Sequence, residues 1–241
     1  MKYKLQYKRY AENAILIEWP SEINEILLED VLFYKKAIEI LYDKLIVEVI
    51  SSYNSLLIYY ISAIKDLYSE VLKLKTLYSD NASENAQKKT LWKIPICYSS
   101  NLAPDLDEFA QEKSLTIDEV IALHASPIYT VYFIGFLPGF LYLGGLKDEL
   151  ILPRKTTPSL SVEKGSVAIG GSQTGVYPSN SPGGWHVIGK TPLNFFDPKS
   201  DDPCFVNPGD KIQFIAIEEK KYNDINMLLK EGVYVIESEN V

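Results

Sequence analysis

Arg154 is the residue of this chain with the most evident chemistry. It is one of two arginines beside 22 lysines, and residues 135–189 around it hold eleven of the thirteen glycines. A planar guanidinium suits a carboxylate or a phosphate better than an ammonium does, and glycines let the backbone approach a ligand closely. The pattern predicts a binding site for an anion. A structural ion pair or a bond to a backbone carbonyl is the alternative role for Arg154.

Three more residues in or near this segment carry groups that bind ligands or move protons. Gln173 and Thr174 stand between glycines, where they either offer donors to a pocket or close a loop. His124 precedes Pro127, which must end a helix, so we expect His124 at a helix C-terminus. There it is either a cation favoured by the helix dipole or a ligand contact and proton carrier.

Two motifs that suggest other enzymes are rejected on physical grounds. Residues 184–191, GWHVIGKT, match the phosphate-loop expression GxxxxGK[ST], but the loop would hold bulky apolar side chains. Pro192 follows where a helix should begin, so we expect a strand over 185–189 instead. Residues 171–175, GSQTG, lack the spacing of a serine nucleophile elbow, and two histidines leave little room for a catalytic triad.

Composition limits the class of protein. The 241 residues are 46% hydrophobic and 23% charged, as in a globular protein of one large domain or two smaller ones. A net charge of −8 argues against nucleic-acid binding. Residues 124–192 carry five basic and three acidic side chains, an excess that attracts a small anion or is a chance fluctuation. We expect no leader, no membrane span and a cytoplasmic protein. Cys97, Cys204 and two histidines predict neither a disulfide framework nor a metal site.

The first part of the chain alternates between strand and helix patterns. The predicted elements are a strand over 13–19, a helix from Ser21 as N-cap to Leu41, strands over 44–50 and 55–61, and a helix over 64–78. This order fits a split βαβ, ferredoxin-like domain. Residues 91–98 or another strand would complete its sheet.

Polar residues 79–90 are the expected linker, so the domains are predicted to cover residues 1–85 and 86–241. After the linker we expect a helix over 105–112 and a second helix that begins at the capping box of Thr116 and Glu119. From residue 128 onward, short strand patterns alternate with Pro and Gly, and 207–210, NPGD, predicts a type II turn. This half is expected to form a β-barrel or sandwich.

Many short motifs of the second half occur in a fixed order. They are His124, 129–131 (YTV), 135–146 (GFLPGFLYLGGL), 153–154 (PR), 165–167 (GSV), 173–178 (QTGVYP), 181–185 (SPGGW), 188–189 (IG), 191–192 (TP), 196–197 (FD) and 208–210 (PGD). This series resembles the family of the bacterial 5-oxoprolinase B subunit, also named allophanate hydrolase subunit 1, which includes an inhibitor of a sporulation histidine kinase. The segments NAILIEW, SLLIYY and IPICY extend the resemblance, more weakly, over nearly the whole chain.

The chain departs from the family pattern at two places. Lys190 stands where the family usually has Arg, and a second basic residue and proline that usually follow the Pro-Arg pair are replaced by KTTPSLSVEKG. These departures weigh against any role that needs a guanidinium at position 190. They also weigh against a catalytic role between Arg154 and Gly165.

The resemblance implies a ferredoxin-like N-terminal domain followed by a cyclophilin-like β-barrel. It implies a B subunit that opens the lactam of 5-oxoproline to L-glutamate together with a homologous, cyclophilin-like C subunit plus an A subunit. ATP is hydrolysed, with Mg²⁺, in the assembled complex. Phosphorylation of the lactam oxygen makes a better leaving group, so no acyl nucleophile is required. The alternatives are an inhibitor of a sensor histidine kinase and a subunit that accompanies allophanate hydrolase or urea amidolyase.

The site residues that follow from the resemblance lie in family motifs, except Lys190, which stands in place of the usual Arg. His124, Arg154 and Gln173 are predicted to be catalytic. The residues predicted to bind substrate or phosphate are Phe136, Pro138, Gly139, Thr174, Tyr177, Ser181, Trp185 and Lys190. No metal site is predicted in this chain.

Overall fold

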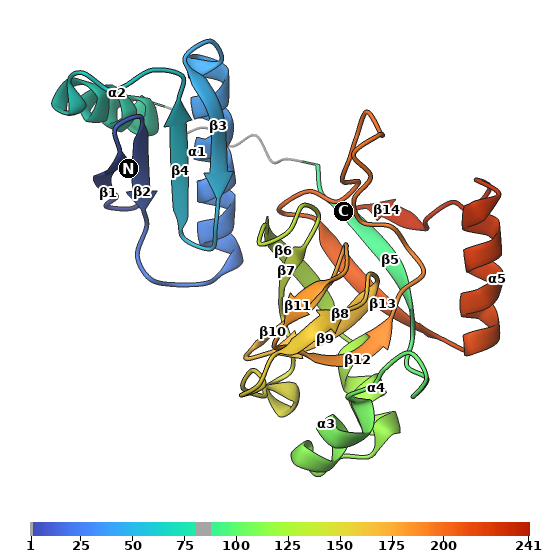
Figure 1. The fold of residues 1–241 in the computed structure, drawn as a ribbon. Helices are drawn as coiled ribbons and strands as arrows, with labels where there is room; N and C mark the ends of the chain where they lie inside the picture. Colours follow the sequence, from blue (N-terminus) through green and yellow to red (C-terminus); the bar gives the residue numbers. More distant parts are fainter. Residues whose placement is uncertain (1, 81–87) are drawn as a thin grey trace. The chain divides into compact units, whose positions relative to one another are not determined.

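The computed structural model describes residues 2–80 and 88–241, and the chain divides into two compact units, Met1–Gln87 and Lys88–Val241 (Figure 1). Each unit has a hydrophobic core of its own. The domain boundary expected between residues 85 and 86, and most of the expected linker, fall on residues 81–87, outside the described residues.

The first unit is a four-stranded antiparallel sheet with two helices. Its elements are β1 (Gln6–Ala11), β2 (Ala14–Glu18), α1 (Glu25–Tyr42), β3 (Ile46–Ser51), β4 (Ser55–Tyr60) and α2 (Leu67–Asp80). The strand order is β1-β2-β4-β3. Both helices bury apolar side chains in one core with the sheet, because Ile38 of α1 and Leu74 of α2 lie in the same cluster as Ile58 of β4.

The expected helix cap is wrong, and of the two alternatives for completing the sheet the second holds. Helix α1 is capped by Asn24, whose Oδ1 accepts from the Leu27 amide at 2.8 Å, and not by Ser21. The sheet is completed by β1, while the strand over residues 91–98 belongs to the second unit. The order β-α-β-β-α is present from β2 to α2. The assignment of a ferredoxin-like fold stays a prediction.

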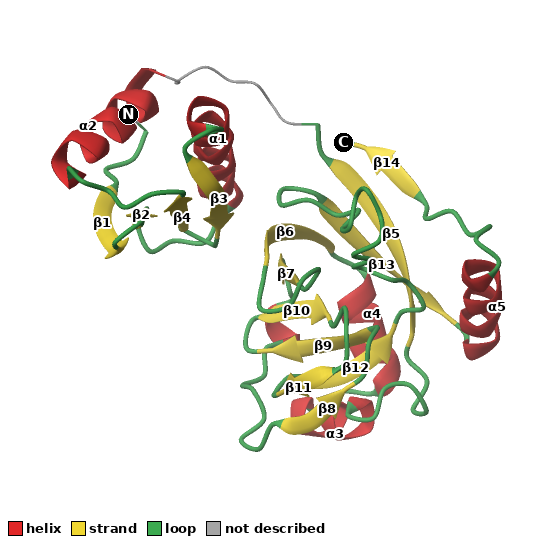
Figure 2. Cartoon of the chain, turned by 45° about the horizontal axis from the view of Figure 1, so that its top comes forward, coloured by secondary structure: helices red, strands yellow, loops and turns green. Residues whose placement is uncertain are grey.

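The second unit is built on a closed β-barrel. The barrel strands are β5 (Thr90–Cys97), β6 (Ile128–Ile134), β7 (Leu141–Gly144), β9 (Ser166–Gly170), β10 (Gln173–Val176), β12 (His186–Lys190) and β13 (Lys211–Ile217). They follow the order β12-β9-β10-β7-β6-β13-β5, and the pair Lys190 and Cys97 closes the ring. A short strand, β14 (Ser238–Asn240), runs beside the start of β5 (Figure 2). The predicted barrel is confirmed, and its cyclophilin-like character stays a prediction.

Helices and a two-stranded ribbon accompany the barrel. The helices are α3 (Leu106–Lys113), α4 (Ile117–Ala125), the 3-10 turn η1 (Asp148–Leu150) and α5 (Glu219–Lys230), and the ribbon pairs β8 (Ser159–Val162) with β11 (Ser181–Gly183). The predicted capping box is confirmed, since Thr116 and Glu119 satisfy each other's backbone amides. The turn at 207–210 is also confirmed, because Gly209 has a φ of 96° and the Asp210 amide donates to the Asn207 carbonyl.

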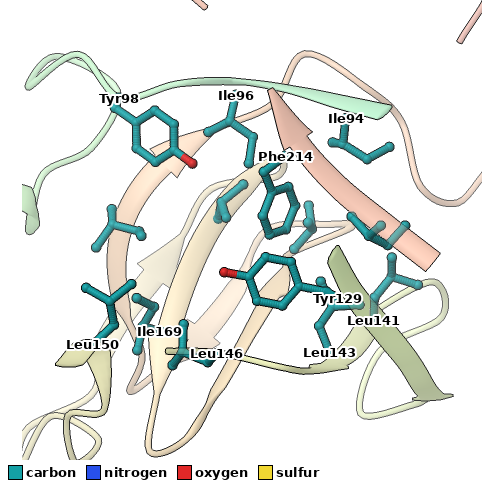
Figure 3. Close-up of a cluster of buried hydrophobic side chains, with 14 of the residues drawn as sticks. Ile94, Ile96, Tyr98, Tyr129, Leu141, Leu143, Leu146, Leu150, Ile169 and Phe214 are labelled. Carbon is teal, nitrogen blue, oxygen red and sulfur yellow. The ribbon is translucent and has the colours of Figure 1, made fainter. Parts of the chain in front are cut away.

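The barrel interior is filled by large side chains from all sides. Figure 3 shows Tyr98, Tyr129 and Phe214 inside the barrel, with both tyrosine hydroxyls pointing inward. The exterior of the barrel carries a smaller cluster, which we call the outer aromatic cluster: Phe140, Val162, Ala168, Tyr177, Trp185 and Val187, flanked by Leu137 and Tyr142. Because Val162 belongs to β8, the β8–β11 ribbon covers this cluster.

Several glycines of the rich segment lie against aromatic rings. A β-carbon would overlap a ring in three pairs: Gly170 with Trp185, Gly183 with Tyr177, and Gly144 with Tyr132. These glycines therefore make room for the packing of side chains. In the described part of the chain, no helix is both long and apolar enough to cross a bilayer.

Candidate functional site

Arg154 lies over the outer aromatic cluster, with its Cζ 5.7 Å from the centre of the Trp185 ring. The arginine is exposed while Trp185 is buried, and the two form a cation-π contact. Among the residues that the structure describes, Arg154 has no carboxylate partner. Burial raises the pKa of Tyr142 and of Tyr177, and the Arg154 charge opposes both increases. The positive charge therefore acts on the cluster beneath it.

The backbone on both sides of Arg154 is fastened to the segment that carries Trp185. The His186 Nε2–H donates to the Pro153 carbonyl at 2.9 Å, and the Lys155 amide donates to the Gly184 carbonyl at 2.8 Å. The two bonds flank Arg154 on one side and Trp185 on the other. They hold the stacked pair in register, although the Arg154 side chain makes no hydrogen bond of its own to this segment.

Asp105 provides a third attachment. Its Oδ2 accepts from the Lys155 Nζ at 2.7 Å and from the Val187 amide at 2.6 Å. Asp105 is the N-cap residue of α3, yet its side chain makes no capping bond. The carboxylate instead joins α3 to β12 and to the loop that carries Arg154. The side chains of both ion-pair partners, Asp105 and Lys155, are largely buried.

Phe136 marks a second exposed edge of the cluster. Its φ is 66°, in the left-handed region that few side chains adopt, and 64% of the residue is exposed. Its ring packs edge-on against Phe140 at 5.6 Å, and Phe140 packs edge-on against Trp185 at 5.5 Å. Backbone strain of this kind persists where the surroundings impose it, often at ligand sites. Pro138 is exposed beside it.

His124 lies in the barrel core and not at this face. It is fully buried, with its ring stacked on Phe214 at 4.8 Å. The Tyr98 hydroxyl bonds to Nδ1 at 2.8 Å and the Thr174 hydroxyl to Nε2 at 2.8 Å. Since Thr174 Oγ1 already donates to the Ala168 carbonyl, it accepts from Nε2–H, which fixes the imidazole as the neutral Nε2–H tautomer.

His124 lies in the last turn of α4, as expected, but its predicted role as a cation there is wrong, while its catalytic role stays a prediction. Burial lowers its pKa to about 3, so the ring is not a cation at the end of α4. The contact between Thr174 and His124 has the spacing of a nucleophile and its base, but both side chains are fully buried in the structure of this chain. The predicted ligand contact of Thr174 stays a prediction, and in the structure its side chain is buried.

The other predicted site residues divide between core and surface. Tyr177 and Trp185 are 2% and 4% exposed, so their rings are core elements of the outer aromatic cluster. Gly139, with a φ of 83°, packs against the backbone of Phe195. Gln173 is half-buried at the start of β10, opposite Gly170. Its catalytic role stays a prediction.

Lys190 and Ser181, the remaining residues predicted to bind substrate or phosphate, are held in other ways. Lys190 ends β12 and forms an ion pair with Glu163, so its charge is already neutralised in the structure. Ser181 lies on β11 opposite Val162, and its Oγ is buried without a hydrogen-bond partner among the described residues. The expected strand in place of a phosphate loop is confirmed by β12.

Asp105 and His186 hold the loop that carries Arg154, but no pattern of neighbouring residues predicts this role. An aspartate before a helix normally predicts a cap, and His186 follows Trp185 in an apolar strand. Their partners lie 82 and 33 residues away along the chain. Only the folded barrel brings these groups together.

The sequence matches a known family model and proteins with assigned names. A family model for the carboxyltransferase domain, subdomain C and D, matches residues 5–206. A Bacillus subtilis (strain 168) protein named as the B subunit of 5-oxoprolinase is 36% identical over 239 residues, 92% of this chain and 97% of that protein. The chain belongs to the 5-oxoprolinase B-subunit family. The resemblance predicted from the motifs is confirmed.

Other members and more distant proteins share parts of the chain. The 5-oxoprolinase B subunit of Escherichia coli O157:H7 is 48% identical over 126 residues, 52% of this chain and 58% of that protein. A urea amidolyase of Saccharomyces cerevisiae (strain ATCC 204508 / S288c) is 27% identical over 150 residues, 57% of this chain and 8% of the enzyme. The family module thus occurs also inside a much longer chain.

Solved structures contain the same module. TTHA0988 is 30% identical with a TM-score of 0.74, over 85% of this chain and 40% of its own. The K. lactis urea amidolyase is 19% identical with a TM-score of 0.81, over 99% of this chain and 16% of its own. At that identity the second likeness shows the fold alone. This family member therefore spans less than half of the chain in each of these larger proteins.

Proposed function

We propose that this chain is the B subunit of an ATP-dependent 5-oxoprolinase, which opens the lactam of 5-oxoproline to L-glutamate together with partner subunits. Relatives named as B subunits of 5-oxoprolinase support the proposal, one of them over 92% of the chain. The match to urea amidolyase covers 8% of that enzyme and does not indicate the substrate of this chain.

The proposal rests on the surroundings of the histidines and cysteines, none of which provides a free base or a reactive thiolate. The buried ring of His124 is bonded at both nitrogens, and His186 holds the Pro153 carbonyl. Burial raises the pKa of the Cys97 and Cys204 thiols, which disfavours a reactive thiolate. A chain without an available thiolate or histidine base fits one part of a composite site better than a self-contained acyl-transfer enzyme.

The GxxxxGKT segment does not fit a nucleotide phosphate. Its residues form β12, which pairs with β9, and Lys190 is bound to Glu163. We therefore assign ATP and Mg²⁺ to the assembled complex, where the nucleotide supplies a phosphoryl group. The described residues of this chain contain no group of three His, Cys, Asp or Glu side chains placed to hold a metal ion.

The partners that we propose are a homologous C subunit plus an A subunit, in the cytoplasm. In such an assembly this chain would contribute one wall of the site. The exposed Arg154 and Phe136 at the edge of the outer aromatic cluster are the groups available for that wall.

The test is reconstitution from purified subunits encoded by neighbouring genes. We expect glutamate release from 5-oxoproline only when this chain, both partners and ATP are all present. Parallel reactions omit one component at a time, and one reaction replaces 5-oxoproline with allophanate. Activity on allophanate alone, or full activity without this chain, would contradict the proposal.

A further inference from the structure

We propose that Arg154, in cation-π contact with Trp185, is a subsite for one carboxylate of a small cyclic ligand. The proposal deepens the proposed function, on which the choice of 5-oxoproline as ligand rests. The chemical class of the ligand follows from the available guanidinium, the ordered backbone around it, the exposed ring on the same cluster and the number of unpaired charges.

The guanidinium of Arg154 is available to a ligand. Arg154 is exposed and has no carboxylate partner within residues 2–80 and 88–241. Its Cζ lies 5.7 Å from the centre of the Trp185 ring, and the guanidinium is a planar fork of N–H donors. A fork of this kind binds a carboxylate through two parallel hydrogen bonds. A lysine would provide a point charge without that geometry.

Arg154 is also held in place before any ligand arrives. Bonds at Pro153 and Lys155 fix the backbone on both sides of it. The Lys155 side chain is held by Asp105, which is itself bonded to the Val187 amide. A loop that is already ordered loses little conformational entropy on binding, so more of the ion-pair energy appears as affinity.

An exposed aromatic ring lies at another edge of the same outer aromatic cluster. Phe136 is 64% exposed in a strained conformation, and its ring is connected to Trp185 through Phe140. A cation and an exposed ring over one buried cluster suit a ligand that has both a negative charge and an apolar ring. A lactam ring that bears one carboxylate has both.

The number of unpaired cations at this site favours a carboxylate over a phosphate as the bound group. Lys155, the neighbour of Arg154, is paired with Asp105, and Lys190 of the GxxxxGKT segment is paired with Glu163. Of these three cations, Arg154 alone has no carboxylate partner among the described residues. A single carboxylate matches one positive charge, whereas a phosphate or nucleotide carries two or more negative charges and requires additional cations.

The experiment compares two ligands that differ only in the carboxylate. The assembled complex is measured with 5-oxoproline as substrate and with 2-pyrrolidinone, the same lactam without the carboxylate, as a competitive inhibitor. The variants are Arg154→Ala, Arg154→Lys and, as matched control, Arg9→Ala, which removes the other arginine. Calorimetric titration of the same ligands and of inorganic phosphate into the full chain accompanies the kinetics.

We expect Arg154→Ala to raise KM for 5-oxoproline by about tenfold or more, with a much smaller change in kcat and in the Ki of 2-pyrrolidinone. Arg154→Lys should recover part of the loss, and Arg9→Ala should change neither constant. An equal loss for both ligands would overturn the proposal in favour of a structural role. Phosphate binding that depends on Arg154 more strongly than 5-oxoproline binding does would overturn the choice of a carboxylate.

The two proposals fail in different ways. If the wild-type complex releases no glutamate, the proposed function is wrong, and the titrations still decide whether Arg154 distinguishes the carboxylate. If the wild-type complex is active while Arg154→Ala keeps the KM of the wild type, the subsite is wrong and the proposed function stands.

Discussion

The His124 ring donates from Nε2 to the Thr174 hydroxyl at 2.8 Å, and that hydroxyl donates in turn to the Ala168 carbonyl at 3.1 Å. Tyr98 completes the series at Nδ1. Every donor in this buried row has an acceptor, so the row stabilises one arrangement of α4, β5 and β10 inside the barrel. It explains why a histidine can lie in the core without a charge.

Stability should fall with acid because of His124. Its native pKa of about 3 lies below the ordinary 6.5, so between these values the unfolded chain binds a proton that the native chain does not. We expect His124 to lower the free energy of unfolding by about 2 kcal/mol between pH 7 and pH 5. Urea unfolding of the wild type and of His124→Gln at both pH values measures this difference.

The pairing of wild type with His124→Gln cancels the carboxylates, which both proteins share. An equal loss of stability in wild type and variant would contradict the assignment. If the variant does not fold, an NMR titration of the native chain gives the same answer, since the His124 imidazole should remain neutral at pH 5.

Thr174 and Ser181 should respond oppositely to loss of their hydroxyls. Thr174→Val leaves a buried imidazole N–H without an acceptor, and we expect a loss of about 1–3 kcal/mol. Ser181→Ala removes a buried oxygen that has no partner among the described residues, and we expect no loss or a small gain. Thermal unfolding of both variants tests the pair, and a similar loss in both would show that Ser181 also has a partner.

Gly170 should not tolerate a side chain. A β-carbon there would overlap the Trp185 ring, so we expect Gly170→Ala to cost about 1–3 kcal/mol. Gly184→Ala is the control, because the nearest atom to its β-carbon would be Pro158 Cγ at 3.7 Å, an ordinary contact. Trp185→Phe in the Gly170→Ala background should recover part of the loss. Equal stability of the two single variants would contradict the packing argument.

Asp105 should act on ligand binding through Lys155. Asp105→Asn weakens the ion pair at 2.7 Å and loosens the loop that carries Arg154. We expect KM for 5-oxoproline to rise by a few-fold, less than in Arg154→Ala, with kcat nearly unchanged. Asp107→Asn, an exposed residue in the first turn of the same helix, is the matched control. A change in kcat with unchanged KM would contradict a positioning role.

Local sequence patterns predict the parts of the fold that depend on neighbouring residues. The capping box at Thr116 and the turn at Gly209 require a few consecutive side chains, and both are present. The strand character of residues 185–189 follows from bulky apolar residues and the proline after them, which a phosphate loop excludes.

The features that local patterns left open or predicted wrongly depend on residues far apart in the sequence. The strand over 91–98 could pair in either unit by its own pattern, and only its parallel pairing with β13 decides the matter. His124 could equally be a surface cation, and only the barrel around it determines its pKa. Asp105 has the position of a helix cap, but local spacing does not predict its ion pair with Lys155 on the loop that carries Arg154.

Strand β5 also has a consequence for synthesis of the chain. Leu91 pairs with Lys211, so the ring cannot close until 120 further residues have been made. The first unit has no such requirement, since its last helix ends at Asp80. On the ribosome, the N-terminal unit can fold before β13 has been made. Until then β5 and β6 lack the strand that pairs with both, and their apolar faces remain uncovered. The N-terminal unit can therefore complete its fold before the unit that carries Arg154 has been fully synthesised.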